Sequence, residues 1–386
     1  MENIEEKACL CALNRIFGFE PKIALALIEI LESASEVFRL SSKDLELITG
    51  PHFKYKGQIC RRAADDAAEE LIRLKNRGIE FYGVTHPGYP ALLKECSDAP
   101  IGLYIRSVSP PEDLWGDGVS IVGTRDISPY GREWCGKIVR SLSYSPHKPV
   151  IVSGLALGTD IEAHRTSLER GLPTIGVMAT GPDIIYPARN RATAELMAAT
   201  PGCALVTDYP PGTAPLAIHF LRRNRIIAGL SKATILIESK IKGGGMATCR
   251  LAFSYNRDVF ALPGRIDDLR SQGCNRLIRE KIAEPITSEE ALLESLGMKL
   301  SARQKAASFR ERLADTFRDT LPAEDQELLH KILSIINKER GITVEDLCTR
   351  AGLSYSRASE AACLLEIEGF ISIDLLQRCS INYKNA

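Results

Sequence analysis

The chain has 386 residues, of which 45% are hydrophobic and 25% charged, and its 49 Lys and Arg equal its 49 Asp and Glu. This length allows two or three domains with cores of their own. No apolar run approaches the ~20 residues that span a bilayer, and Met1 to Glu6 lack the basic start of a secretory signal, so we expect a cytoplasmic protein with no membrane partner.

The eleven cysteines include no Cys-x-x-Cys pair. The sequence therefore predicts neither a zinc site nor a dithiol redox motif, and free thiols buried in a reducing compartment are the better account. We expect no metal and no cofactor.

Residues 1–78 have the pattern of a small helical domain. An apolar helical face ends at Phe17, a turn runs from Gly18 to Pro21, and Ile23 begins a second helix. This arrangement resembles a helix-hairpin-helix, a module that grips DNA backbone through its turn amides. The turn has one glycine and an acidic residue, which favours a structural or partner-binding role instead.

From residue 79 to residue 300, short β-branched runs alternate with glycine turns and helical stretches. Strands alternating with helices predict an α/β domain of Rossmann-like type, with a mostly parallel sheet and helices on both faces. Ligands of such sheets bind at the C-terminal ends of the strands. The predicted strands are Val119–Val122, Val150–Val152, Thr174–Met178, Ala204–Val206, Ala233–Ile237 and Asp258–Leu262.

The first strand end of interest carries Gly123, Thr124 and Arg125. The Gly-x-Gly-x-x-Gly pattern of a dinucleotide site is absent. A permanently charged guanidinium directly after a strand suits an anionic ligand. The alternative is that Arg125 pairs with a nearby carboxylate.

The second strand end runs from Ser153 to Asp160. The glycines and hydroxyls beside Ser153 and Gly154 predict an amide nest for an anion, while Asp160 fits an ordinary N-cap equally well. No Lys follows Gly158 as it does in a P-loop, which argues against nucleotide hydrolysis. His164 lacks a nucleophile partner, so we expect a structural histidine.

The third strand end leads into a loop from Gly181 to Arg191, which combines Tyr186 with Arg189 and Asn190. A ring and cations on one loop suit single-stranded nucleic acid, because bases stack on the ring while phosphates meet the charges. The alternative is a proline-fixed loop with Tyr186 packed inward.

The fourth region, Ile218 to Arg250, holds seven Lys or Arg against one acid. It joins an arginine-rich helix to the turn from Gly243 to Thr248, whose glycines let backbone N–H groups approach an anion. The alternative without a ligand is that the arginines form a solvated helix face and the glycines form a tight turn. Over the four regions, the residues that we expect to bind nucleic acid are Gly123, Thr124, Arg125, Ser153, Gly154, Arg189, Asn190, Arg222, Arg223, Asn224, Arg225, Lys242, Gly244, Gly245 and Thr248.

The C-terminal part predicts a polar helical linker at 301–320 and a winged helix at 321–386. This last segment has seven Lys or Arg and ten Asp or Glu, and its predicted third helix begins near Ser354 with a single arginine. A domain that binds double-stranded DNA needs several cations to contact the phosphates. The charge therefore favours a protein-contact or regulatory role.

Five motifs in order resemble the DNA processing protein A family, also called DprA or Smf, over roughly Gly83 to Leu296. The resemblance implies an extended Rossmann-like domain that binds single-stranded DNA without catalysis, protects incoming DNA, forms a homodimer and helps to load the RecA recombinase in natural transformation. The N-terminal helices and the winged helix are similar to family appendages. The motifs are Val122–Arg125, Ser153–Asp160 with His164, Tyr186–Pro187, Arg222–Ser231 and Ala261–Gly264.

Carried over by motif, the resemblance places Arg125, the Ser153–Gly154 turn, the loop after Tyr186–Pro187, and Arg222 to Arg225 around the DNA. It also implies that the helix from Gly273 to Arg279 contributes to a dimer, although its apolar residues suit packing on the sheet as well.

The chain departs from the family pattern at three places. It has Phe220–Leu221 where the family usually has Phe-Pro, and Gly244 to Thr248 where the family has Gly-Ser-Leu-Ile-Thr. Ala188 stands where a Lys is frequent, and Arg189 is the candidate substitute for that Lys.

An enzymatic alternative is a lonely-guy-type phosphoribohydrolase, which shares the general sheet and cradles a nucleotide with a Gly-rich turn such as Gly243–Gly245. That family's turn normally begins with Pro and is followed by a helix that contains Glu. Here Lys242 precedes the turn and Cys249–Arg250 follow it. DNA binding is therefore favoured, and an assay for cleavage of AMP-type nucleotides discriminates between the two.

Overall fold

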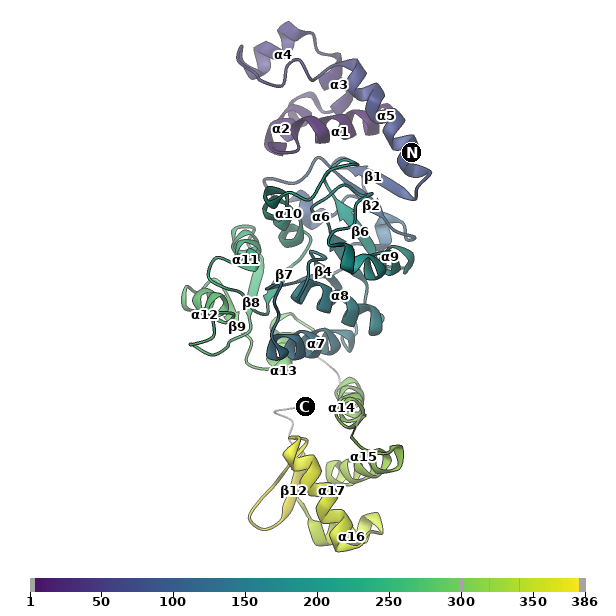
Figure 1. Ribbon diagram of the computed structural model, residues 1–386, viewed down its shortest axis with the longest axis vertical. Coiled ribbons are helices and arrows are strands. Elements are labelled where there is room, and N and C mark those ends of the chain that lie inside the picture. Colours follow the sequence, from purple (N-terminus) through teal and green to yellow (C-terminus); the bar gives the residue numbers. More distant parts are fainter. Residues whose placement is uncertain (1–3, 299–301, 319, 340, 382–386) are drawn as a thin grey trace. The chain divides into compact units, whose positions relative to one another are not determined.

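The computed structural model describes residues 4–298, 302–318, 320–339 and 341–381. Two compact units make up the chain: Met1–Ser143 with His147–Thr287, and Tyr144–Pro146 with Ser288–Ala386. The first unit holds the N-terminal helices and the large sheet, and the second holds α13 (Glu289–Ser295) and the elements after it (Figure 1). Across the described ranges, no helix has both the length and the apolar composition for crossing a bilayer.

The N-terminal helices form where the sequence provides starts and stops. Pro21 stands in the first turn of α2, where its missing N–H costs nothing, and the Ser33 and Ser41 side chains cap the helices that follow them. The five helices are α1 (Ile4–Phe17), α2 (Pro21–Leu31), α3 (Ala34–Arg39), α4 (Ser42–Thr49) and α5 (Arg61–Lys75).

The large sheet has nine strands in the described part of the chain, in the order β1-β2-β6-β5-β4-β3-β7-β8-β9. The strands β3 to β9 pair in parallel, and β2 pairs antiparallel with both β1 and β6. The strands are β1 (Ile79–Gly83), β2 (Gly102–Arg106), β3 (Gly118–Val122), β4 (Val150–Ser153), β5 (Thr174–Val177), β6 (Ala204–Thr207), β7 (Ala233–Leu236), β8 (Asp258–Ala261) and β9 (Glu284–Pro285).

The six strands predicted from the sequence are confirmed as β3 to β8, and the mostly parallel Rossmann-like sheet is confirmed with them. The sequence did not single out β1, β2 or β9. The edge pair β1 and β2 is antiparallel, and β9 has two residues, so neither carries the long apolar run that marks the central strands.

The order in which the chain connects the strands creates a crevice between β3 and β7. The chain moves from β3 through β4 and β5 to β6, and then returns to form β7 on the other side of β3. Right-handed crossovers then put α7 to α9 on one face and α10 to α12 on the other. The helices are α6 (Ala91–Lys94), α7 (Pro129–Ser143), α8 (Thr159–Glu169), α9 (Arg191–Ala199), α10 (Ala217–Gly229), α11 (Gly244–Ser254) and α12 (Gln272–Arg279). Such a reversal between β3 and β7 is where open α/β sheets bind ligands.

The N-terminal helices share one hydrophobic core with the sheet. Leu10 and Leu13 of α1 are buried in the same cluster as Phe81 of β1 and Tyr104 of β2. Burying a side chain of this size stabilises the fold by about 1.5 to 3 kcal/mol. The helical part is therefore packed onto the sheet rather than tethered to it.

The second unit packs around its own core, which includes Leu329, Ile332, Leu347 and Phe370. Helices α15, α16 and α17 are followed by the hairpin of β11 and β12, and the small sheet has the order β10-β12-β11. This order of elements is consistent with the three helices and β wing predicted from the sequence. The elements are α13 (Glu289–Ser295), α14 (Ala302–Phe317), α15 (Ala323–Lys338), β10 (Ile342–Thr343), α16 (Val344–Ala351), α17 (Tyr355–Ile367), β11 (Ile371–Ile373) and β12 (Arg378–Ile381).

Candidate nucleic-acid site

A pocket of about 780 Å³ opens at the C-terminal ends of β3 and β7, where the chain order reverses. Its wall is built from the residues after β3, from one face of α10, and from the turn that leads into α11. The three segments lie far apart in the sequence, and the parallel sheet brings them together because each follows the same end of a strand.

The pocket contains an aromatic ring with two guanidinium groups close to it. Phe220 lies on α10, with the Arg125 guanidinium 5.1 Å from its ring centroid and the Arg223 guanidinium 5.9 Å away. Tyr186 meets the same ring edge-on, with the centroids 5.7 Å apart. Phe220, Arg223 and Asn224 share one helix face because they are three and four residues apart. The arrangement offers an apolar surface next to two positive charges.

Arg223 is the buried member of this arrangement. Its side chain is 4% exposed, and its Nη1 donates to the carbonyls of Gly154, at 2.5 Å, and of Val177. Burial lowers the pKa of Arg223 to about 10, so the group keeps its charge at neutral pH. A Cβ at Gly154 would lie 2.4 Å from that nitrogen, which explains the glycine. Arg223 therefore supplies a fixed positive charge at the base of the pocket.

Asp160 stands beside Arg223 and has an ordinary structural set of contacts. Its Oδ2 accepts from the amides of Gly154, at 3.1 Å, and Ala156, at 3.4 Å. Burial raises the pKa of Asp160, and the neighbouring Arg223 acts in the opposite direction. The carboxylate organises the turn after β4 and opposes part of the positive charge there.

The start of α11 forms the opposite wall. Gly243 precedes the helix and Gly244 is its first residue, so the first N–H groups of α11 have no partner within the helix. These groups and the helix dipole favour an anion, and the exposed Lys240 and Lys242 line the same wall. Gly245 packs tightly, since a Cβ there would lie 2.6 Å from the Leu236 side chain.

The structure brings many of the predicted residues into the pocket. The lining residues absent from the sequence-based set include Tyr186, Phe220, Leu221 and Lys240. Phe220 had a signal, because it precedes Arg223 and Asn224 by one helical turn. The predicted residues that line the pocket are Gly123, Thr124, Arg125, Arg223, Asn224, Lys242, Gly244, Gly245 and Thr248.

Four of the other predicted residues lie behind or beside the pocket. The buried Ser153 hydroxyl donates to the Ile121 carbonyl at 2.6 Å, and Gly154 accepts from Arg223. Asn190 is buried and donates to the Leu155 carbonyl at 2.9 Å. Arg189 is exposed but is not among the residues that line the pocket. The first three hold the loops that shape the pocket.

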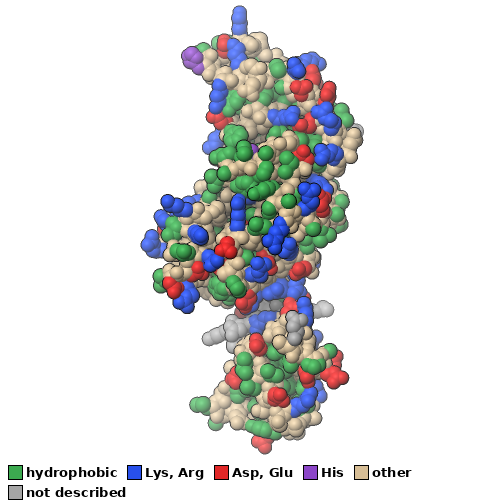
Figure 2. Space-filling view, viewed as in Figure 1, with side chains coloured by type: hydrophobic (Ala, Val, Ile, Leu, Met, Phe, Trp, Pro, Cys, Tyr) green, Lys and Arg blue, Asp and Glu red, His purple; other side chains and the backbone are tan. Residues whose placement is uncertain are grey.

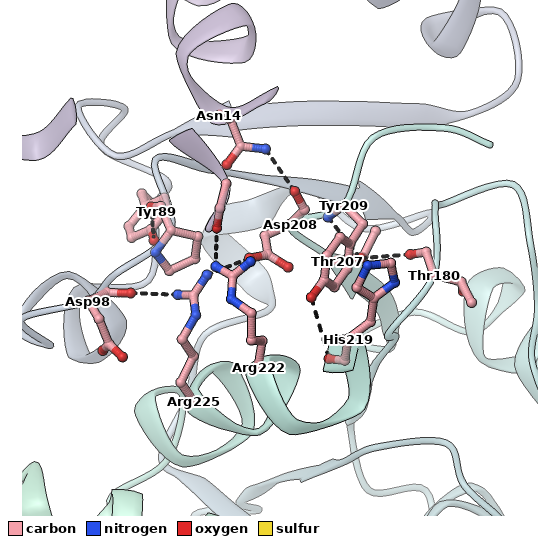
Figure 3. A network of polar contacts seen from close by, with 12 residues as sticks. Asn14, Tyr89, Asp98, Thr180, Thr207, Asp208, Tyr209, His219, Arg222 and Arg225 are labelled. Carbon is pink, nitrogen blue, oxygen red and sulfur yellow. Dashed lines mark hydrogen bonds and ion pairs between the residues drawn. The ribbon is translucent and has the colours of Figure 1, made fainter. Parts of the chain in front are cut away.

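Arg225 requires a correction, because the sequence placed it with Arg125 over one edge of the sheet. Its guanidinium is buried, with Nη2 2.5 Å from Asp208 Oδ2 and Nη1 donating to the Asp98 carbonyl at 2.5 Å (Figure 3). Arg225 lies 200° around the helix from Arg223, since each residue turns by about 100°. It is therefore directed away from the pocket.

Arg222 is also directed away from the pocket, which corrects its expected position. Its Nη2 donates to the Gly18 carbonyl, and its guanidinium lies 4.1 Å from the ring centroid of Phe19. Burial lowers the pKa of Arg222, and Asp208 opposes that change. Figure 3 shows Arg222 and Arg225 rising from α10 toward Asp208, with Asn14 approaching from α1. The helix thus joins the pocket to the N-terminal helices.

Comparison with known proteins gives one consistent result. The family model of DNA recombination-mediator protein A matches residues 80–297. The chain is 36% identical to protein Smf of Synechocystis sp. over 297 residues, which covers 76% of this chain and 73% of the relative. It is 39% identical to DNA processing protein DprA of Streptococcus pneumoniae over 205 residues, or 53% of this chain and 70% of the relative.

Solved structures agree with the sequence comparison. The X-ray structure of DNA processing protein A from Streptococcus pneumoniae superposes with a TM-score of 0.54 at 32% identity, covering 67% of this chain and 92% of that one. DNA processing protein A from Helicobacter pylori, described for its single-stranded DNA binding mode, gives a TM-score of 0.50 at 29% identity, covering 56% and 95%.

Proposed function

Since this chain belongs to the DNA recombination-mediator protein A family, we propose that it binds single-stranded DNA in the pocket at the ends of β3 and β7. The observation that carries the proposal is Phe220 in the pocket with the guanidinium groups of Arg125 and Arg223 beside its ring. A ring stacks on any base, and guanidinium groups meet phosphates, so the binding is tolerant of sequence. The amides that begin α11 supply a second place for a phosphate.

The same geometry favours single strands over duplexes. Bases in a duplex are stacked on each other and present only their edges, so they cannot lie flat on Phe220. Phe220 stands inside a pocket rather than on a projecting helix, and its neighbour Arg223 is 4% exposed. A flexible strand can enter such a pocket, whereas a helix in the major groove needs an exposed row of side chains.

We also propose that the chain is not an enzyme. The α11 helix of a lonely-guy-type hydrolase would carry a glutamate, and here its sequence from Gly244 to Ser254 has no carboxylate. The two carboxylates lining the pocket are engaged elsewhere: Asp160 accepts from backbone amides, and Asp126 is 2.6 Å from Arg270. Both observations support binding without hydrolysis.

The proposed biological role is that of a cytoplasmic mediator, which protects incoming single strands and helps to load the RecA recombinase during natural transformation. The description of the matched family as a recombination mediator supports it. The role requires that the bound strand be released to another protein, and the screened phosphate contacts that we propose are of a reversible kind.

We further propose a homodimer that uses the surface near α12. Leu277 of α12 is fully buried and packs inward, so it is not available to a partner. The loop before the helix supplies apolar surface instead, because Ile266 is 90% exposed and Leu269 is 60% exposed. Light scattering at micromolar concentration should give twice the chain mass, and a monomer mass would contradict the dimer.

The decisive experiment for DNA binding compares one oligonucleotide as a single strand and as a duplex of the same length. We expect preference for the single strand and a log–log salt slope of about −0.7 for each phosphate neutralised. Equal affinity for the duplex would exclude the proposal. Incubation with AMP-type nucleotides tests the alternative, and release of the free base would show hydrolysis.

A further inference from the structure

A ridge of exposed apolar side chains leads from the pocket to the turn between α1 and α2. Leu221 lines the pocket and is 55% exposed, Ile218 is 49% exposed, and Phe19 in the turn is 57% exposed. With about 100° between successive residues, Ile218 lies between Leu221 and Arg222 around α10. Hydrophobic side chains gather over α10 and next to the N-terminal helices in Figure 2.

Phe19 is held in place at the far end of this ridge. The Arg222 guanidinium lies 4.1 Å from its ring centroid, and Arg222 also donates to the carbonyl of Gly18. The ring of the buried His219 is 6.1 Å away. One side of the Phe19 ring is therefore covered by protein, while more than half of the side chain remains exposed.

The turn itself is anchored to the sheet. The Asn14 side chain of α1 donates to the Asp208 carbonyl at 2.8 Å, and Asp208 also binds Arg225 of α10 (Figure 3). Glu20, the acid beside Phe19, is 2.6 Å from the Lys54 ammonium, so its charge is compensated. Phe19 is thus presented at a fixed position with little net negative charge beside it.

We propose that Phe19 is a base-stacking platform for single-stranded DNA that continues out of the pocket over Leu221 and Ile218. The inference rests on the proposed function and extends it to the N-terminal helices. An exposed ring stacks on any base, and a guanidinium behind the ring strengthens its fixed orientation. The N-terminal helices then contribute directly to the DNA-binding surface.

DNA fits this ridge better than a protein partner does. The ridge is continuous with the pocket, because Leu221 belongs to both. Three side chains offer far less than the roughly 800 Å² per partner that a stable protein–protein interface buries. A single base, in contrast, needs only one aromatic ring on which to stack.

The test uses the full chain and thymidine oligonucleotides of about 5 and about 20 nucleotides, which lie near the lower end and beyond the upper end of the site sizes of single-strand binders. Phe19→Ala is compared with the wild type and with Ile30→Ala, which removes an apolar side chain that is 62% exposed on α2. Phe19→Ala should bind the long oligonucleotide at least about fivefold more weakly and the short one unchanged. Ile30→Ala should match the wild type with both.

A long oligonucleotide whose outer nucleotides lack bases should bind wild type and Phe19→Ala alike. If Phe19→Ala binds the long thymidine oligonucleotide as the wild type does, the platform is excluded and the ridge is left for a protein. If the wild type binds neither oligonucleotide, the proposed function fails as well.

Should Phe19→Ala prove unstable, Phe19→Trp gives an independent measurement. The new indole emission, taken as the difference from the wild type with its two tryptophans, should be quenched by the long oligonucleotide and not by the short one. Absence of quenching by a long oligonucleotide that is bound would overturn the platform.

Discussion

Arg223 and Arg225 stand two residues apart on α10 and bind different parts of the molecule. Arg223 lies under Phe220 and donates to the carbonyls of Gly154 and Val177, whereas Arg225 pairs with the buried Asp208. The arginine-rich run is therefore divided by the helical period between the pocket and the contact with the N-terminal helices. Arginines of the same run therefore contribute either to the pocket or to the stability of the fold, and single substitutions can distinguish the two roles.

Arg125→Ala should weaken single-strand binding without destabilising the fold. Arg125 is exposed at the pocket, and its guanidinium lies over the ring of Phe220. Losing a charge-assisted phosphate contact should cost about 1 to 3 kcal/mol of binding free energy. The salt slope should become shallower by about 0.7. Fluorescence anisotropy at several salt concentrations measures both, with the exposed Arg62→Ala as control.

Arg225→Ala should have the opposite signature. Removing the guanidinium leaves Asp208 buried without its partner, which should lower the free energy of unfolding by about 3 to 5 kcal/mol. The salt slope of the folded fraction should stay that of the wild type. Thermal melts and the same anisotropy series decide, and a shallower salt slope with an unchanged melt would show that Arg225 contacts phosphate after all.

The Asp208→Asn background supplies a check on that interpretation. If the loss of stability comes from an uncompensated buried carboxylate, Arg225→Ala should cost less when Asp208 is already neutral. If Arg225→Ala lowers the free energy of unfolding equally in the wild type and in Asp208→Asn, the loss of the ion pair is not the cause of the destabilisation.

The sequence predicted the fold better than it predicted the individual site residues. Apolar runs such as Val119–Val122 need both faces of a sheet covered, so they identify central strands without further information. The positions of Arg222 and Arg225 depend instead on which helix face meets the N-terminal helices. That face is set by Phe19, in the turn after α1, and by Asp208, in the loop before α10, so the residues of the helix alone do not reveal it.

Deleting residues 321–386 should leave single-strand affinity nearly unchanged. The segment has more acids than cations, and arginines in its described part are paired with acids: Arg357 is 2.7 Å from Asp325, and Arg378 is 2.8 Å from Asp374. Paired arginines add little attraction for phosphate. Anisotropy on the truncated chain checks this, and a large loss of affinity would mean that the segment contacts DNA.

His164 should make the fold sensitive to acid. The Thr174 hydroxyl donates to the Ile151 carbonyl, so it accepts a hydrogen bond from His164 Nδ1–H. Burial, with Arg223 nearby, lowers the pKa of His164 from its ordinary 6.5 to about 3. Below pH 6.5 the unfolded chain binds a proton that the folded chain does not, so stability is lost as the pH falls through this window.

The measurement is the free energy of unfolding of the wild type and of His164→Gln at several pH values between 6.5 and about 3. Each pH unit in the window should cost the wild type up to about 1.4 kcal/mol more than the variant, since carboxylates contribute equally to both. Parallel pH profiles for the two proteins would mean that His164 is protonated in the folded state.

Gly244 and Gly245 form a matched pair at the start of α11. Among the described residues, a Cβ at Gly244 would meet no atom within 4 Å, whereas a Cβ at Gly245 would lie 2.6 Å from the Leu236 side chain. Gly244→Ala should therefore keep or slightly raise the melting temperature, because Ala favours a helix by about 1 kcal/mol over Gly. Gly245→Ala should lower it.

The substitution that is tolerated by the fold, Gly244→Ala, should impair DNA binding. The methyl group at position 244 projects into the pocket at the helix start, where the bare amides meet the phosphate that we propose. Gly244→Ala should thus weaken single-strand binding while the protein stays fully folded, as anisotropy and a thermal melt on one preparation would show. Wild-type affinity in Gly244→Ala would mean that the strand does not approach the start of α11, and would leave Arg125 and Phe220 as the binding surface.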